Sequence, residues 1–110
     1  MKVMFISDLH GSYYWANRAI EKYHEEKADK LIILGDILYH GPRNDLPKDY
    51  NCKKVIALLN PLKKDIIAVR GNCDSEVDQM VLDFPMRSDY ALMDVDQHHF
   101  FMTHGHLFNE

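Results

Sequence analysis

Cysteine, glycine, proline and long apolar runs are all scarce in this sequence, and these scarcities exclude several classes of protein. The 110 residues contain two cysteines, five glycines and four prolines. Two cysteines without a Cys-x-x-Cys motif give no disulfide framework, so we expect a reduced, cytoplasmic protein. No segment approaches the roughly 20 apolar residues that a membrane span needs, and the apolar run near Met1 is too short for a signal peptide.

Basic residues are also in the minority, with 13 lysines and arginines against 17 aspartates and glutamates, a net charge of −4. This balance gives no electrostatic footprint for sequence-independent nucleic-acid binding, so we expect no nucleic-acid partner. No Gly-x-Gly-x-x-Gly or Walker motif is present, which disfavours a nucleotide-binding module. The length and the ordinary composition, 46% hydrophobic, predict one domain over residues 1–110. Seven histidines are the compositional outlier.

Hydrophobic periodicity predicts alternating strands and helices. Buried strands are expected at Val3–Ser7, Leu31–Leu34 and Ile66–Val69. Helices are expected after Ser12, over Lys53–Leu62 and over Ser75–Leu82. In the first helix the apolar residues at helical spacing are Trp15, Ala16, Ala19, Ile20 and Tyr23. Pro61 leaves the last turn of the second helix open, because proline disrupts a helix interior. This order of elements favours βαβ units and a parallel sheet.

Two further segments differ from this alternation. The stretch from Tyr39 to Asn51 is rich in turn formers and contains two prolines, so we expect a long loop over the carboxyl edge of the sheet. Tyr90–Val95 and Phe100–Thr103 predict two strands of a hairpin, joined by a polar turn at Asp96-Gln97.

Potential metal ligands follow the predicted strands. They are Asp8, His10, Asp36, Asn72 and His104. Each has an ordinary structural explanation, since Gly-Asp, Asp-x-His and Gly-Asn are common in turns and a histidine often lies at the surface. The carboxyl ends of parallel strands meet at one edge, however, so together these residues predict a metal site. Carboxylate and imidazole ligands suit manganese, iron, zinc or nickel, and one bridging carboxylate would serve two ions about 3.5–4 Å apart.

These blocks resemble the calcineurin-like metallophosphoesterase family, whose pattern runs Asp-x-His, Gly-Asp, Gly-Asn, His and Gly-His-x-His. The matching blocks are Asp8-Leu9-His10, Gly35-Asp36, Gly71-Asn72 and His104. The residues around these blocks are also similar to those of the small bacterial phosphodiesterases of the YfcE type. The resemblance implies an α/β fold, a layered sheet with flanking helices. The final Gly-His-x-His block is absent, so we expect the amino-terminal portion of the domain, truncated at the carboxyl end.

By this resemblance, Asp8 and His10 bind a first metal, Asn72 and His104 a second, and Asp36 bridges both. Asp36 and Asn72 are the implied catalytic residues. The implied reaction is hydrolysis of a small phosphodiester by a hydroxide held between two divalent ions. Manganese is the usual activator in the family, and zinc, iron and nickel remain open. No membrane partner is implied, and a homo-oligomer is left open.

Some roles keep alternatives. Cys73 stands where many family members carry a histidine that protonates the leaving group, so the general acid is unassigned. As a nucleophile Cys73 is disfavoured, because its acidic surroundings do not lower a thiol pKa. Arg43 and Arg70 either contact phosphate or are solvated surface charges. The alternative function is a non-catalytic protein-binding scaffold of the same fold.

Overall fold

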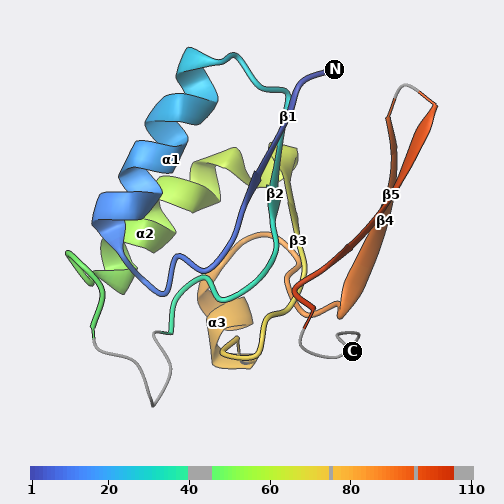
Figure 1. Cartoon of the computed structure of the whole chain (residues 1–110). Coiled ribbons are helices and arrows are strands. Elements are labelled where there is room, and N and C mark those ends of the chain that lie inside the picture. Colours follow the sequence, from blue (N-terminus) through green and yellow to red (C-terminus); the bar gives the residue numbers. More distant parts are fainter. Residues whose placement is uncertain (40–45, 75, 96, 106–110) are drawn as a thin grey trace.

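A three-stranded parallel sheet positions most of the predicted site. The computed structural model describes residues 1–39, 46–74, 76–95 and 97–105 (Figure 1). In this sheet the strand order is β1-β2-β3, formed by Val3–Ile6, Lys30–Ile33 and Ile66–Ala68. The register pairs Ile6 with Ile33 and Ile33 with Ala68, so the carboxyl ends of the three strands lie level. Leu31, Ile32 and Ile33 of the central strand are fully buried, as its run of aliphatic residues predicts.

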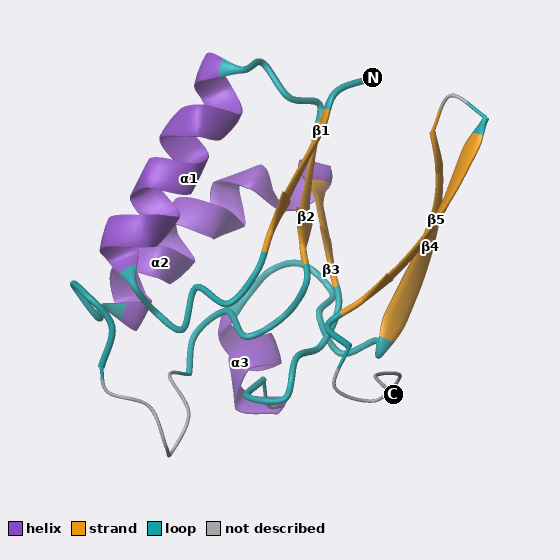
Figure 2. Cartoon of the chain, viewed as in Figure 1, coloured by secondary structure: helices purple, strands orange, loops and turns teal. Residues whose placement is uncertain are grey.

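Two helices cover one face of this sheet (Figures 1 and 2). Helix α1 spans Tyr13–Glu25, and the side chain of Ser12 accepts the N–H of Trp15, which confirms the predicted cap. Its buried residues are Ala16, Ile20 and Tyr23. Trp15 was grouped with the apolar face but is 54% exposed, because it lies one position beyond the stripe that meets the sheet.

Helix α2 spans Cys52–Leu59 and is shorter than predicted. From Asn60 to Asp65 the chain continues as a 3₁₀ helix, η1, with Pro61 in its first turn. Proline has no N–H to donate and is tolerated only where a helix starts, so Pro61 ends α2 and begins the tighter turn. The prediction of an α-helix up to Leu62 was therefore wrong in its last turn.

The hairpin is confirmed, and it forms a separate two-stranded antiparallel sheet of β4, Tyr90–Val95, and β5, His98–Thr103. Strand β5 begins two residues earlier than predicted. Of the predicted turn, Gln97 has a left-handed φ of 70° and Asp96 lies outside the described residues. The hairpin stands on the side of the parallel sheet opposite α1 and α2 (Figure 1). Contact between the two sheets includes the rings of Phe5 and Phe100, whose centroids are 6.1 Å apart.

The remaining elements lie near the carboxyl edge of the parallel sheet. Helix α3 spans Glu76–Val81, close to its prediction, and Ser75 lies outside the described residues. Residues 40–45 of the predicted loop, which include Arg43, also lie outside them. The described helices are all too short or too polar to cross a membrane. The prediction of an α/β fold with helices flanking a parallel sheet is confirmed.

Candidate metal centre

The loops that follow β1 and β2 run side by side and carry three of the predicted ligands. The N–H of Asp8 donates to the carbonyl of Gly35 at 3.1 Å, and the N–H of His10 donates to the carbonyl of Asp36 at 2.9 Å. These bonds continue the pairing of two parallel strands beyond their ends. The carboxyl edge of the sheet therefore brings together Asp8, His10 and Asp36, as the sequence predicts.

All three residues adopt a left-handed backbone conformation. The φ angles are 58° at Asp8, 49° at His10 and 55° at Asp36, three of the six positive values at described non-glycine residues. A side chain in this region costs about 1–3 kcal/mol, and such residues concentrate at binding and active sites. This backbone strain occurs where the loops after β1 and β2 turn sharply and direct the side chains of Asp8, His10 and Asp36 toward one point.

His104 reaches the same point from the other sheet. Its Nδ1 donates to the carbonyl oxygen of Leu34, at the end of β2, over 2.6 Å. The sequence-based expectation placed all five residues at the ends of strands in one parallel sheet. For His104 this was wrong, because β5 pairs only with β4 among the described strands and reaches the edge by packing.

Two carboxylates and two imidazoles converge at this edge. The Nε2 of His10 lies 3.2 Å from Oδ1 of Asp8 and 3.8 Å from Oδ2 of Asp36. The Nε2 of His104 lies 3.9 Å from the same Asp8 oxygen and 3.2 Å from the same Asp36 oxygen. Asp36 is 2% exposed and lies at the centre, whereas the Asp8 side chain is 51% exposed and lies at the rim.

The hydrogen bonds of the two rings determine which nitrogen faces the carboxylates. Nδ1 of His10 lies 2.9 Å from the carbonyl oxygen of Tyr39, and Nδ1 of His104 bonds the carbonyl of Leu34. A carbonyl oxygen only accepts, so both Nδ1 atoms carry the proton. In the neutral ring, Nε2 then presents a lone pair to a carboxylate oxygen, which is repulsive unless a proton or a cation lies between them. Metal-binding histidines commonly donate their second nitrogen to a carbonyl in this way.

The pKa values of Asp36 and Asp8 are shifted in opposite directions from the ordinary value of a carboxyl group. Burial raises the pKa of Asp36, and the nearby carboxyls of Asp8 and Asp74 act in the same direction against the N–H of Cys73 and the imidazole of His104. Burial also acts to raise the pKa of Asp8, but the Ser7 hydroxyl, Asp36 and the two imidazoles outweigh it and lower that pKa. A buried carboxylate held next to another is an unfavourable arrangement that a bound cation would relieve.

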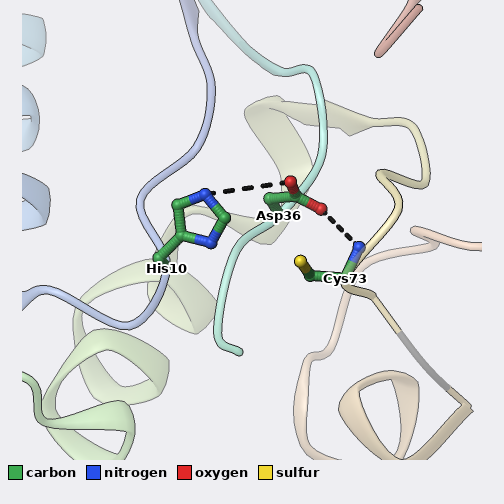
Figure 3. Close-up of side chains that lie close together, drawn as sticks. All are labelled: His10, Asp36 and Cys73. Carbon is green, nitrogen blue, oxygen red and sulfur yellow. Dashed lines mark hydrogen bonds and ion pairs between the residues drawn. The ribbon is translucent and has the colours of Figure 1, made fainter. Parts of the chain in front are cut away.

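Cys73 lies on the side of Asp36 opposite His10 (Figure 3). Its backbone N–H donates to Oδ1 of Asp36 at 2.7 Å, which leaves Oδ2 directed at the imidazoles. Potential ligand atoms form two groups, and within each group all atoms lie within 4.8 Å of one another. One group joins His10, Asp36 and Cys73, and the other joins Asp8, Asp36 and His104. Burial raises the pKa of the Cys73 thiol, and the charges of Asp36, Asp74 and Asp8 raise it further.

The remaining predicted residues are Asn72, Arg70 and Arg43. Asn72 lies exposed in the turn after β3, directly before Cys73. Its role as a ligand stays a prediction. Arg70 donates from Nε and Nη2 to one carboxylate oxygen of Asp89, at 3.0 and 2.8 Å, so its guanidinium is used in an ion pair. Arg43 lies outside the described residues.

Two residues of the site were not predicted from the sequence. Ser7 donates its hydroxyl to Oδ2 of Asp8 at 2.5 Å. Asp74 is a buried carboxylate at the end of the turn that contains Asn72 and Cys73. The signal for Asp74 was an acid three residues after the strand-end glycine Gly71, because Asp side chains accept backbone N–H groups in turns.

Comparison with known proteins gives consistent matches over the whole chain. A family model described as the calcineurin-like phosphoesterase superfamily domain matches residues 1–110. Phosphodiesterase YfcE of Escherichia coli (strain K12) is 50% identical over 108 residues, 98% of this chain and 59% of that protein. The solved structure of this E. coli phosphoesterase superposes with a TM-score of 0.95, at 50% identity, over 97% of this chain and 59% of that one. An archaeal phosphodiesterase gives a TM-score of 0.67 at 26% identity, over 96% and 60% of the two chains.

Proposed function

The chain belongs to the calcineurin-like phosphoesterase superfamily, and from this premise we propose that it is a metal-dependent phosphodiesterase. The E. coli and archaeal proteins that it matches are both described as phosphodiesterases. The chain spans 59% of the length of the E. coli relative, so activity, substrate and partners are part of the proposal. The observation that carries it is the pair of imidazole Nε2 atoms that face the oxygens of Asp8 and Asp36.

The donor set supports two divalent cations. Asp36 belongs to both groups of ligand atoms, which supports a shared role, although these groups join Asp8 to His104 and His10 to Cys73 and so divide the other residues differently from the family pattern. By the family pattern, Asp8 and His10 would hold one ion, and His104 with Asn72 the other. Oδ1 of Asp36 accepts the N–H of Cys73, while Oδ2 faces the two imidazoles, and Asp36 would serve as a ligand to both ions. Mixed imidazole and carboxylate donors suit manganese, which we propose as the native metal, with zinc, iron and nickel as competitors.

When bound, such cations would neutralise charge developing on the phosphoryl oxygens and lower the pKa of water, so that hydroxide can attack phosphorus. The chain's own residues hold this arrangement in place. The carbonyls of Leu34 and Tyr39 fix the two imidazole rings, and the N–H of Cys73 fixes the carboxylate of Asp36. In the metal-free chain, burial and the carboxylates of Asp36, Asp74 and Asp8 raise the pKa of the Cys73 thiol, which disfavours the thiolate that a covalent phospho-enzyme would need.

The experiment is hydrolysis of a chromogenic aryl phosphodiester by the purified chain after chelation and readdition of single metals. We expect no turnover after chelation and recovery with manganese. Turnover that survives complete chelation would contradict the proposal. A folded chain that gains no turnover with any divalent ion would instead support the protein-binding scaffold.

We further propose a small phosphodiester substrate and a cytoplasmic location. The net charge of −4 argues against a polyanionic substrate. Both cysteines are free, which suits a reducing compartment. Competition between the chromogenic substrate and single-stranded DNA tests the first point, since strong inhibition by DNA would contradict it. Fractionation of the source cells tests the second.

A further inference from the structure

The turn after β3 holds the loop after β2 through Asp74, and we infer that Asp74 is the positioning residue that fixes the backbone of Asp36. The inference rests on the proposed function only in that Asp36 is taken as a metal ligand. Asp74 belongs to neither group of ligand atoms, and both of its carboxylate oxygens accept backbone N–H groups.

Three N–H groups converge on this carboxylate. Oδ2 of Asp74 accepts the N–H of Asp36 at 2.7 Å and that of Gly71 at 2.7 Å. Oδ1 accepts the N–H of Ile37 at 3.0 Å. Asp74 is 7% exposed, so these bonds replace the water that its charge would otherwise need. One side chain therefore joins the ends of two neighbouring strands.

The two loops also touch through their backbones. A Cβ added to Gly35 would lie 2.5 Å from the N of Gly71, and a Cβ added to Gly71 would lie 2.3 Å from Oδ1 of Asp36. Gly35 adopts a φ of +96°, which glycine alone tolerates readily. The absence of side chains at both positions lets the carboxylate of Asp74 reach across to Asp36.

These contacts act on a strained residue. Asp36 has a φ of 55°, and its own N–H and that of Ile37 are both held by Asp74. Without these bonds, the backbone would relax toward the ordinary right-handed or extended regions. Such a change would swing the carboxylate of Asp36 away from His10 and His104. Asp74 thus acts on the metal centre through Asp36.

The direct test is Asp74→Asn, which keeps the shape of the side chain but replaces one acceptor oxygen with an NH₂ donor. At least one of the three backbone N–H groups then loses its partner. We expect manganese affinity, measured from the electron paramagnetic resonance signal of free Mn²⁺, to fall about 10- to 100-fold. The matched control is Val55→Ala, which lowers stability from a buried position in α2. Unchanged affinity in Asp74→Asn, or an equal fall in Val55→Ala, would overturn the inference.

Amide hydrogen exchange tests the same contacts without metal. In the metal-free wild type, we expect the amides of Asp36, Ile37 and Gly71 to exchange slowly, although they lie beyond the strand ends. In Asp74→Asn these three should exchange faster while the amides of α1 keep their protection. Fast exchange of the three in the wild type would overturn the inference, and this measurement still decides if the variant fails to fold. A wild type that binds no manganese would overturn the proposed function and leave the exchange result as the test of Asp74.

Discussion

The Nδ1 atom of His104 donates a hydrogen bond to the carbonyl oxygen of Leu34 at 2.6 Å, across a separation of 70 residues. This bond joins the end of the hairpin to the end of the central strand. It also directs the second ring nitrogen at Asp36, 3.2 Å away. One contact therefore contributes both to the tertiary structure and to the orientation of a proposed ligand.

Replacing Asp36 by asparagine should separate the metal centre from the stability of the fold. We expect Asp36→Asn to lose manganese binding and about 100-fold or more of the activity, since losing a shared ligand should cost more than losing an outer-shell partner. Because burial raises the pKa of Asp36, removing its charge should leave the metal-free protein at least as stable as the wild type. Manganese titration, phosphodiester turnover and urea denaturation measure these effects. Asp94→Asn, at an exposed position in β4 where the carboxylate pairs with His99, is the control that should leave manganese binding and turnover unchanged. Retained activity in Asp36→Asn would remove the two-metal assignment.

Cys73 should be dispensable as a nucleophile. We expect Cys73→Ser to keep most of the activity, because attack by hydroxide needs no thiolate. Since the pKa of this thiol lies above its ordinary value in the metal-free chain, alkylation of the metal-free protein by iodoacetamide at pH 7.5 should be slower than that of glutathione and should accelerate only at higher pH. Mass spectrometry of the tryptic peptide follows the reaction at this one cysteine. A phosphorylated Cys73, or rapid alkylation at pH 7.5, would refute this reading.

Because the backbone at Asp8 is left-handed, we predict that glycine at this position gives a more stable protein than alanine, the reverse of the usual order in a helix. Alanine at a φ of 58° should cost about 1–2 kcal/mol relative to glycine, so Asp8→Gly should be more stable than Asp8→Ala. In the middle of α1, Arg18→Gly should instead be less stable than Arg18→Ala by about 1 kcal/mol. Chemical denaturation of the four variants without metal measures both differences. The same order at both positions would mean that the loop relaxes and carries no strain.

Additional ligands should strengthen metal binding. The family pattern includes a Gly-His-x-His block that these 110 residues lack, and the chain spans 59% of the E. coli relative. We predict that a chimera carrying the remaining segment of that relative binds manganese at least tenfold more tightly than the 110-residue chain. Isothermal titration of both proteins measures this, and a chimera whose two added histidines are replaced by alanine is the control. Equal affinity in all three would mean that the described ligands suffice.

The order of elements and the placement of three of the proposed ligands could be predicted from the sequence because they depend on local signals. Aliphatic runs mark β1, β2 and β3, and parallel strands deliver Asp8, His10 and Asp36 to one edge by topology alone. The place of His104 could not be derived in this way, since its position at the edge depends on how the hairpin packs. Trp15 could not be placed either, because helical spacing shows which side of α1 is apolar but not how many residues across that side are buried.

The sequence predicts less about the turn after β3. Asn72 and Cys73 stood out because their side chains are possible ligands or nucleophiles. The sequence does not predict the role of Asp74, because an acid in a turn is common and its three partners are backbone groups from two separate loops. Backbone donors leave no trace in the residue pattern. The role of such a carboxylate therefore becomes visible only when the loops are seen together.

The division of the proposed ligands between two separately hydrogen-bonded sheets has a thermodynamic consequence. A cation that contacts Asp36 and His104 together binds only while the hairpin is docked, so its binding free energy adds to the stability of docking. At 100 times the dissociation constant this linkage amounts to at most about 2.7 kcal/mol, the value for an undocked form that does not bind the ion. The ion would then act as a reversible cross-link between the two sheets, and undocking of β4 and β5 would remove His104 from it.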